Sequence, residues 1–312
     1  MSGLIRQLAL VSESTQVPLS DVMRVAAALQ KQAMRDLGPI WEVSATVDAF
    51  EKLEDVPLGY WRMVIKDNIG FAGAAGIHLD RDNQPFALIT ASTDVDTWSL
   101  TASHESVEML VDPFGNRLLA GDSPMQGQGR VEFLVEVGDP SEAAEFGYSV
   151  NGILMSDFYT PRYFDPVRAD GVRYSFTSSI KEPRQVLRGG YLSWHDPVSD
   201  HWFQEIFFTG TKSQFRDIGI LTGGTGSIRS QIDRLTEAET LKAMAPGRKA
   251  ATAAGITAAV SMDSVSARAA HLRKQIDAII GGAPATARVA AAPARSPMRR
   301  VSARKRRTGA VR

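Results

Sequence analysis

Apolar residues in the first 112 positions recur with two different periods, and the two periods predict different elements. Val22, Val25, Leu29 and Ala33 fall on one face of a helix, which we expect over residues 21–37, before a Gly-Pro stop. Alternating or short apolar runs predict strands at residues 41–47, 61–65, 77–79 and 85–91, the last two as a hairpin around residues 80–83. The expected order is helix, strands, an edge-like strand and one more strand, followed by a second helix.

The second helix, residues 101–111, carries the most informative polar residues. It is otherwise apolar, ends at an Asp-Pro turn and contains His104, Glu105 and Glu108. Residues four apart share a helix face, so the imidazole at 104 and the carboxylate at 108 can bind one divalent ion. Glu105 is then free to accept a proton from bound water, as in the His-Glu-x-x-His helix of zinc hydrolases. In the alternative interpretation His104 caps or bridges locally, and the two acids form a solvated face.

The rest of the chain changes in composition and predicted secondary structure twice. A strand is expected at 131–137, then a helical turn at 142–148, a strand at 150–158, and short strands at 171–176 and 202–208 within an irregular lobe. From about residue 212 the sequence becomes helical and alanine-rich. We therefore expect a folded domain at 1–210, a helical extension at 211–282 and a disordered tail at 283–312.

Together these motifs resemble the zincin-like metalloprotease superfamily in a variant form. The shared pieces are the His-Glu-x-x-Glu helix with its Asp-Pro turn, a Glu-x-x-Asp at residues 136–139 and an Asn-Gly pair at 151–152. The resemblance covers roughly residues 20–208 and implies an α+β fold: a twisted mixed sheet, a backing helix and a metal-site helix, with an irregular β-rich lobe. Residues 191–197 also resemble a block in bacterial and phage-associated proteins of unassigned function.

The resemblance also implies roles for individual residues. His104 and Glu108 are expected as metal ligands, Glu105 as the general base, and either Glu136 or Asp139 as the third ligand, with a slight preference for Glu136. The expected metal is zinc, and the anionic ligand set makes manganese, iron and calcium alternatives. Glu136 also has a structural interpretation, because residues 131–137 alternate like an ordinary strand that turns Glu136 outward.

Four more residues are candidates for catalysis or substrate contact. His195, within Trp-His-Asp-Pro, is a candidate for stabilising developing negative charge. His78, on the expected edge strand, and the aromatic residues Tyr159 and Tyr163 are candidates for binding substrate. The structural alternatives are turn stabilisation for His195, a surface hairpin position for His78 and core packing for the two tyrosines.

Composition adds constraints on compartment and partners. The chain has no cysteine, which excludes disulfides and thiolate ligands and favours a reducing compartment, so we expect a cytoplasmic protein. No apolar run approaches the roughly 18 residues of a transmembrane helix. Nine of the 35 basic residues but none of the 35 acidic residues lie in 283–312, so this tail is a candidate for binding nucleic acid or an acidic partner.

Two functions follow from these observations. The Gly-rich loops of nucleotide-binding proteins and the Gly-x-Ser-x-Gly elbow of serine hydrolases are both missing from the sequence. We therefore expect a metal-dependent hydrolase acting on peptides or proteins. The alternative is a catalytically silent zincin-fold protein, associated with a phage or mobile element, whose basic tail recruits DNA or a partner.

Overall fold

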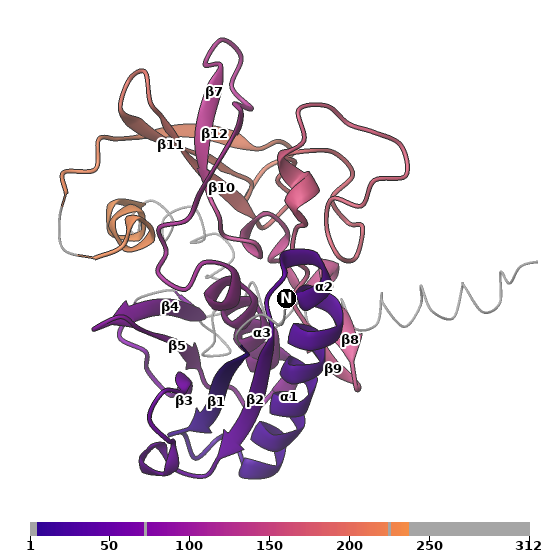
Figure 1. The fold of residues 1–312 in the computed structure, drawn as a ribbon, viewed down its shortest axis with the longest axis vertical. Coiled ribbons are helices and arrows are strands. Elements are labelled where there is room, and N and C mark those ends of the chain that lie inside the picture. Colours follow the sequence, from indigo (N-terminus) through magenta and orange to yellow (C-terminus); the bar gives the residue numbers. More distant parts are fainter. Residues whose placement is uncertain (1–4, 72–73, 224–225, 237–312) are drawn as a thin grey trace, which may run out of the picture. The chain divides into compact units, whose positions relative to one another are not determined.

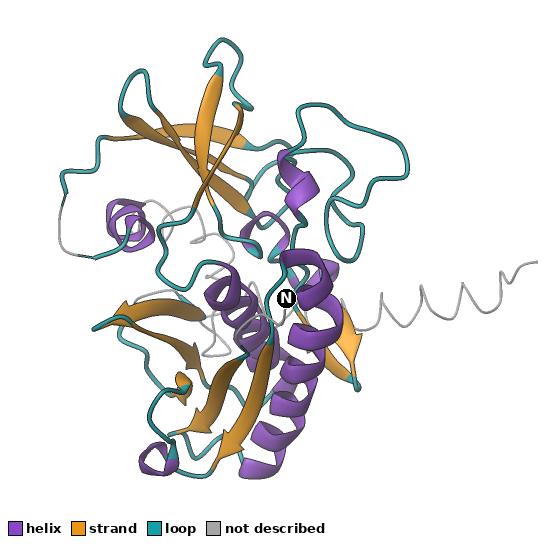
Figure 2. Ribbon diagram, viewed as in Figure 1, coloured by secondary structure: helices purple, strands orange, loops and turns teal. Residues whose placement is uncertain are grey.

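The computed structural model describes residues 5–71, 74–223 and 226–236, which form several sheets and a few helices (Figures 1 and 2). The predicted α+β class is confirmed. Most of the predicted helical extension and all of the basic tail lie outside the described residues. Among the described helices, none has both the length and the apolar character required to cross a membrane.

The first sheet contains five strands in the order β2-β1-β3-β5-β4. Their bounds are β1 Arg6–Ser12, β2 Ala45–Phe50, β3 Trp61–Lys66, β4 Gly76–Arg81 and β5 Gln84–Thr90. The first four strands in that order are parallel, and β4 is an antiparallel edge strand. The continuous apolar run Leu8–Val11 in β1 is fully buried, as expected for a parallel strand covered on both faces. The predicted hairpin and its edge strand are confirmed as β4 and β5.

The first helix, α1 (Leu19–Lys31), buries the predicted apolar face and continues through a π-helical turn, Gln32–Leu37, into the short α2, Gly38–Trp41. The strand expected at residues 41–47 is therefore wrong at its start. Trp41 ends α2 and donates its indole N–H to the carbonyl of Tyr159 at 2.9 Å. Glu42 then adopts a left-handed conformation (φ 57°), and β2 begins only at Ala45.

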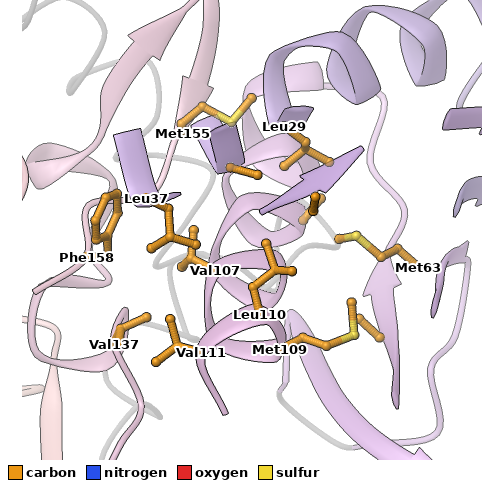
Figure 3. Close-up of a cluster of buried hydrophobic side chains, with 14 of the residues drawn as sticks. Leu29, Leu37, Met63, Val107, Met109, Leu110, Val111, Val137, Met155 and Phe158 are labelled. Atoms are coloured by element: carbon orange, nitrogen blue, oxygen red, sulfur yellow. The ribbon is translucent and has the colours of Figure 1, made fainter. Parts of the chain in front are cut away.

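The second long helix, α3 (Val95–Val111), is buried on all sides from Asp96 to Val111. It contacts β4 and β5, and α1 packs nearby, so the main core lies between the first sheet and these helices. Figure 3 shows part of this core, in which Val107 and Leu110 of α3 lie between Phe158 and Met63. A helix enclosed in this way keeps its polar side chains away from bulk solvent.

The second sheet is antiparallel, in the order β12-β11-β10-β7-β6. Its strands are β6 Leu118–Asp122, β7 Arg130–Leu134, β10 Tyr191–Asp196, β11 His201–Ile206 and β12 Gln214–Gly219. The strand predicted at residues 131–137 thus ends earlier, at Leu134. β12 pairs with β11 although it lies in residues that we assigned to the helical extension. After a gap at 224–225, residues 228–236 are helical.

A two-stranded hairpin, β8 (Tyr148–Val150) and β9 (Ile153–Met155), replaces the single strand expected at 150–158. Its turn is the Asn151-Gly152 pair, and both residues have positive φ angles, as a tight hairpin requires. β9 contacts α3. Instead of the strand expected at 171–176, the chain makes only an isolated bridge between Tyr159 and Ser175. Short 3-10 helices complete the described elements, at Leu53–Asp55, Asp139–Ser141, Ala144–Phe146 and Pro161–Phe164.

Candidate metal centre

Hydrogen bonds on one face of α3 fix the rotation of the helix about its axis. The Ser103 hydroxyl donates to the Gln32 side chain at 2.8 Å and accepts the Ser156 N–H at 2.9 Å. One turn earlier, the Ser99 hydroxyl donates to the Leu154 carbonyl at 2.9 Å. At 100° per residue, His104, Glu105 and Glu108 lie on the opposite face of the helix. The serine face therefore determines where the three predicted site residues point.

The first buried group consists of His104, Glu108 and Asp139. His104 Nε2 lies 3.3 Å from Glu108 Oε2 and also 3.3 Å from Asp139 Oδ1. All three side chains are buried, and no described residue hydrogen-bonds to Asp139 Oδ1. One ligand atom from each residue lies within 4.8 Å of the others, so the group could hold a metal ion.

Gly138 allows the chain to approach α3 closely enough for Asp139 to join this group. Its N–H donates to Glu108 Oε1 at 3.1 Å. A Cβ atom at this position would lie 2.6 Å from His104 Nδ1, so any larger residue would displace the imidazole. Gly138 was not predicted to matter, although a glycine beside a candidate ligand is a signal for close backbone approach.

The geometry favours Asp139 as the third ligand over Glu136, which we slightly preferred from the sequence. Glu136 follows the end of β7 and is buried, so its side chain is not the outward strand residue of the alternative interpretation. It forms a close ion pair with Arg229 instead of joining the His104 group. Because β7 ends at Leu134, the alternation of residues 131–137 does not predict the direction of Glu136.

A second buried group contains His78, Glu105 and Glu108, and thus shares Glu108 with the first. His78 comes from the edge strand β4, and its Nδ1 lies 3.4 Å from Glu105 Oε2 and 3.6 Å from Glu108 Oε2. Only 2% of His78 is exposed, so the surface hairpin alternative is wrong. Gly76 permits the approach of β4 to α3, because a Cβ there would lie 2.7 Å from Glu105 Oε1.

Arg229, which the sequence analysis missed, completes the charged cluster. Its Nη1 lies 2.7 Å from Glu108 Oε2 and 3.0 Å from His78 Nδ1, and it also contacts Glu136. The residue is 7% exposed and lies 121 positions after Glu108 in the sequence. A single arginine in a polar segment gives no local signal of this role. The apolar pair Ile228 and Ile232 at helical spacing is the only hint that the segment docks.

Burial and mutual charge shift the pKa values of these groups in opposite directions. Burial opposes the Glu108 carboxylate, but His104 and Arg229 outweigh it and hold the pKa of Glu108 well below its usual value. Burial, together with the Glu108 charge, raises the pKa of Asp139 to about 7. Burial also raises the pKa of Glu136, against the attraction of Arg229. For His104, the neighbouring carboxylates overcome burial and raise its pKa well above its usual value.

The remaining predicted residues lie outside both groups. His195 is on β10 of the second sheet, where Nδ1 bonds to Glu132 and Nε2 to Asp200, both at 3.0 Å. Tyr159 and Tyr163 are fully buried and stack on one another with ring centroids 4.4 Å apart. This placement agrees with the core-packing alternative for the tyrosines. His195 lies at the end of β10 and its contact with Asp200 spans the turn at residues 197–200, which agrees with the turn-stabilising alternative.

Comparison of the chain with protein-family models, with curated proteins and with solved structures gives no match. Membership of the zincin-like superfamily therefore stays a prediction. Any function assigned to this chain rests on the geometry and chemistry of its buried side chains.

Proposed function

We propose that this chain is a metal-dependent hydrolase of zincin type that cleaves peptide bonds. The observation that carries the proposal is the convergence of Glu108 Oε2 and Asp139 Oδ1 on the single nitrogen His104 Nε2, each at 3.3 Å. An ordinary ion pair needs only one carboxylate per ring nitrogen. Three ligand atoms that surround a common point are the arrangement that a divalent ion requires.

The residues fit such an ion by two tests. Asp139 Oδ1 is buried, and the partner that the structure describes for it, His104 Nε2 at 3.3 Å, is shared with Glu108, a condition that a bound cation would relieve. One imidazole and two carboxylates form a ligand set suited to zinc, manganese or iron. An ion held by His104, Glu108 and Asp139 would supply a polarised carbonyl and a water molecule of lowered pKa.

Glu105 is the residue of this chain best placed to move a proton. It follows His104 by one residue, 100° further round α3, it is 3% exposed, and its Oε2 has no hydrogen-bond partner among the residues that the structure describes. This oxygen would accept a proton from the attacking water and transfer it to the leaving amine. His78 Nδ1, 3.4 Å from this oxygen, would orient the carboxylate.

The arrangement of elements around the site supports a zincin-type architecture. The antiparallel edge strand β4 lies against α3, and α1 packs on the same mixed sheet. An edge strand beside the metal-site helix can pair with an extended peptide through its free backbone groups. This feature is the reason to prefer a peptide over other hydrolysable substrates.

Metal analysis of the purified protein tests the proposal. After chelation and reloading with Zn²⁺ or Mn²⁺, we expect one ion per chain in the wild type and in Glu105→Gln, and close to none in His104→Ala and Asp139→Asn. Glu105→Gln should lose peptide hydrolysis while it retains metal and fold. The metallohydrolase proposal is ruled out if the wild-type protein binds no ion, or if His104→Ala binds as much metal as the wild type.

A second function, a catalytically silent protein of the same fold, is favoured by one observation. Arg229 already neutralises part of the acidic cluster, so His104 and the carboxylates could serve as an internal brace without metal. In that case the chelated protein should melt at the same temperature as the loaded protein. Bound metal should instead raise the melting temperature if the site is a metal centre, because ligands that bind only the folded state stabilise it.

A further inference from the structure

His78 has no role in the proposed function beyond orienting Glu105, although its group also contains Glu108, a ligand of the first site. The group nevertheless contains the atoms of a second cation site: His78 Nδ1 from β4 and carboxylate oxygens of Glu105 and Glu108 from α3, all within 4.8 Å of one another. All three residues are buried. Glu105 Oε2 and His78 Nε2 have no hydrogen-bond partner within the described ranges. Buried polar atoms left in this state need an explanation.

The guanidinium of Arg229 lies at this second position in an unusual way. Three acceptors meet on the one nitrogen Nη1: Glu108 Oε2 at 2.7 Å, His78 Nδ1 at 3.0 Å and Glu136 Oε2. A guanidinium Nη carries two protons, so it can donate to at most two of the three. Carboxylates also usually pair with arginine through two parallel hydrogen bonds to two nitrogens. Convergence on one point is the geometry that a divalent cation satisfies and that an arginine nitrogen satisfies only in part.

The segment that delivers Arg229 is anchored to the turn after α3. The Ile228 N–H donates to the Asn116 side chain at 2.8 Å, and the Arg229 N–H donates to the Gly115 carbonyl at 3.1 Å. Gly115 has φ +58°, and a Cβ there would lie 3.0 Å from Arg229 Cβ. Ile232, 2% exposed, packs with Leu134 and Trp202. The anchors lie outside the ligand cluster, so the segment is held independently of the charge that it brings.

Charge explains why a cation is needed at this position. Glu105, Glu108, Glu136 and Asp139 place four carboxyl groups in a buried region that also holds two histidines. One divalent ion at His104 would leave most of this charge on the His78 side uncompensated, and buried charges without partners are costly. Arg229 supplies one positive charge there, and a second divalent ion would supply two.

We propose that His78, Glu105, Glu108 and Glu136 form a second divalent-cation site, bridged to the first through Glu108, and that Arg229 is its resident cation in the wild-type chain. The wild-type protein therefore holds one metal ion, and replacement of Arg229 by a neutral residue opens a two-ion site. The proposal takes the single ion of the proposed function as its reference. Its own evidence comes from His78, Glu136 and Arg229, while Glu105 and Glu108 belong to both arguments.

The experiment counts ions in a set of variants. Arg229→Met is chelated, titrated with Mn²⁺ and analysed for metal content, alone and combined with His78→Ala or Asp139→Asn. We expect one ion per chain in the wild type and in Arg229→Lys, which keeps the charge, and two in Arg229→Met. His78→Ala should return the Arg229→Met protein to one ion. Two Mn²⁺ ions that share Glu108 should also show exchange coupling by electron paramagnetic resonance.

The outcomes separate this inference from the proposed function. One ion in both the wild type and Arg229→Met overturns the second site and leaves the first intact. The wild type could instead bind no ion while Arg229→Met binds one. If that ion is lost with His78→Ala and retained with Asp139→Asn, the result supports the second site and rules out the first. Two ions in the wild type would show that Arg229 is not the resident cation.

Loss of folding in Arg229→Met is handled by a second measurement. If the variant does not fold without metal, it is refolded in the presence of Mn²⁺ and followed by circular dichroism. We expect the ion to replace the lost charge and restore the fold with two ions per chain. If Arg229→Lys folds but Mn²⁺ does not restore the fold of Arg229→Met, the proposal is overturned.

Discussion

Two histidines of this protein each lie between two carboxylates, yet their surroundings are opposite. His195, on the second sheet, uses Nδ1 for Glu132 and Nε2 for Asp200, each at 3.0 Å. His104, on α3, receives both of its carboxylates on the one nitrogen Nε2, each at 3.3 Å. The Asp200 side chain is 72% exposed, whereas the carboxylates beside His104 are at most 3% exposed.

The difference separates an ion pair from a ligand set. Around His195 each ring nitrogen has its own partner, and solvent screens what charge remains. Around His104 two acceptors share one nitrogen, and because both carboxylates are buried, solvent screens their charge far less. The residue types alone, one imidazole and two acids, do not distinguish these cases. The number of ring nitrogens used and the burial of the carboxylates do.

The largest expected effect comes from removing the charge shared by both buried groups. Glu108→Gln leaves Arg229 and His104 in the interior with one fewer counter-charge, and breaking a buried ion pair in this way should cost about 3 kcal/mol or more of unfolding free energy. The matched change beside His195, Asp200→Asn, should have no measurable effect, because that pair is exposed. Urea denaturation of both variants measures the contrast, and equal costs would contradict it.

The next effect tests close approach of the backbone. Gly138→Ala places a Cβ 2.6 Å from His104 Nδ1, so we expect a loss of about 1 to 3 kcal/mol and loss of metal binding, because the imidazole must move. Gly127→Ala is the control. It has φ +88° but no neighbouring atoms within 4 Å, so it should cost about 1 kcal/mol through backbone strain and leave the metal count unchanged. Metal retained by Gly138→Ala would show that the contact is not needed.

The effect of pH on metal binding should be smaller but has a definite sign. Burial and the Glu108 charge raise the pKa of Asp139 to about 7, and a protonated carboxyl cannot serve as a ligand. Metal affinity should therefore fall as pH decreases through 7, by about tenfold per pH unit for each proton displaced. Competition with a chelator at pH 8.5 and pH 6 measures the change. Equal affinities at the two pH values would contradict the assignment of Asp139.

The smallest effect of a histidine substitution is expected at His195, whose partner Asp200 is 72% exposed. Burial lowers the pKa of His195, but its hydrogen bonds to Glu132 and Asp200 more than compensate and raise it. The charged form is thus favoured by folding, and its contribution is present at pH 6 and is lost as pH rises through the raised pKa. His195→Gln should cost less than about 1 kcal/mol at pH 6, and less still at pH 8, with the metal count unchanged. A larger loss of unfolding free energy at pH 8 than at pH 6 would contradict the raised pKa of His195.

Part of the site could be predicted from the sequence because its information is local. The spacing of His104, Glu105 and Glu108 within an apolar helix fixes their common face, and helix geometry does not depend on the rest of the fold. The β4–β5 hairpin was predictable for the same reason. His78 was placed on the correct edge strand, but its burial against α3 depends on Gly76 and could not be derived from local pattern.

The remainder depends on long-range contacts. The choice between Glu136 and Asp139 is decided by where β7 ends and by the approach of Gly138 to α3. Arg229 reaches Glu108 across 121 residues, and no periodicity connects the two. The strand predicted at 41–47 starts too early, because Trp41 is buried for a different reason, as the end of α2 and the donor to Tyr159.

The anchoring of Arg229 has a consequence for how the chain can be divided. A fragment that stops at residue 210, the boundary predicted from the sequence, would retain Glu105, Glu108, Glu136 and Asp139 and lose Arg229, which pairs with two of them. During synthesis, the acidic residues would likewise lack the charge of Arg229 until the chain has emerged from the ribosome beyond that residue. The smallest piece able to fold unaided should therefore extend at least to Ile232, whose side chain secures the returning segment against Leu134 and Trp202.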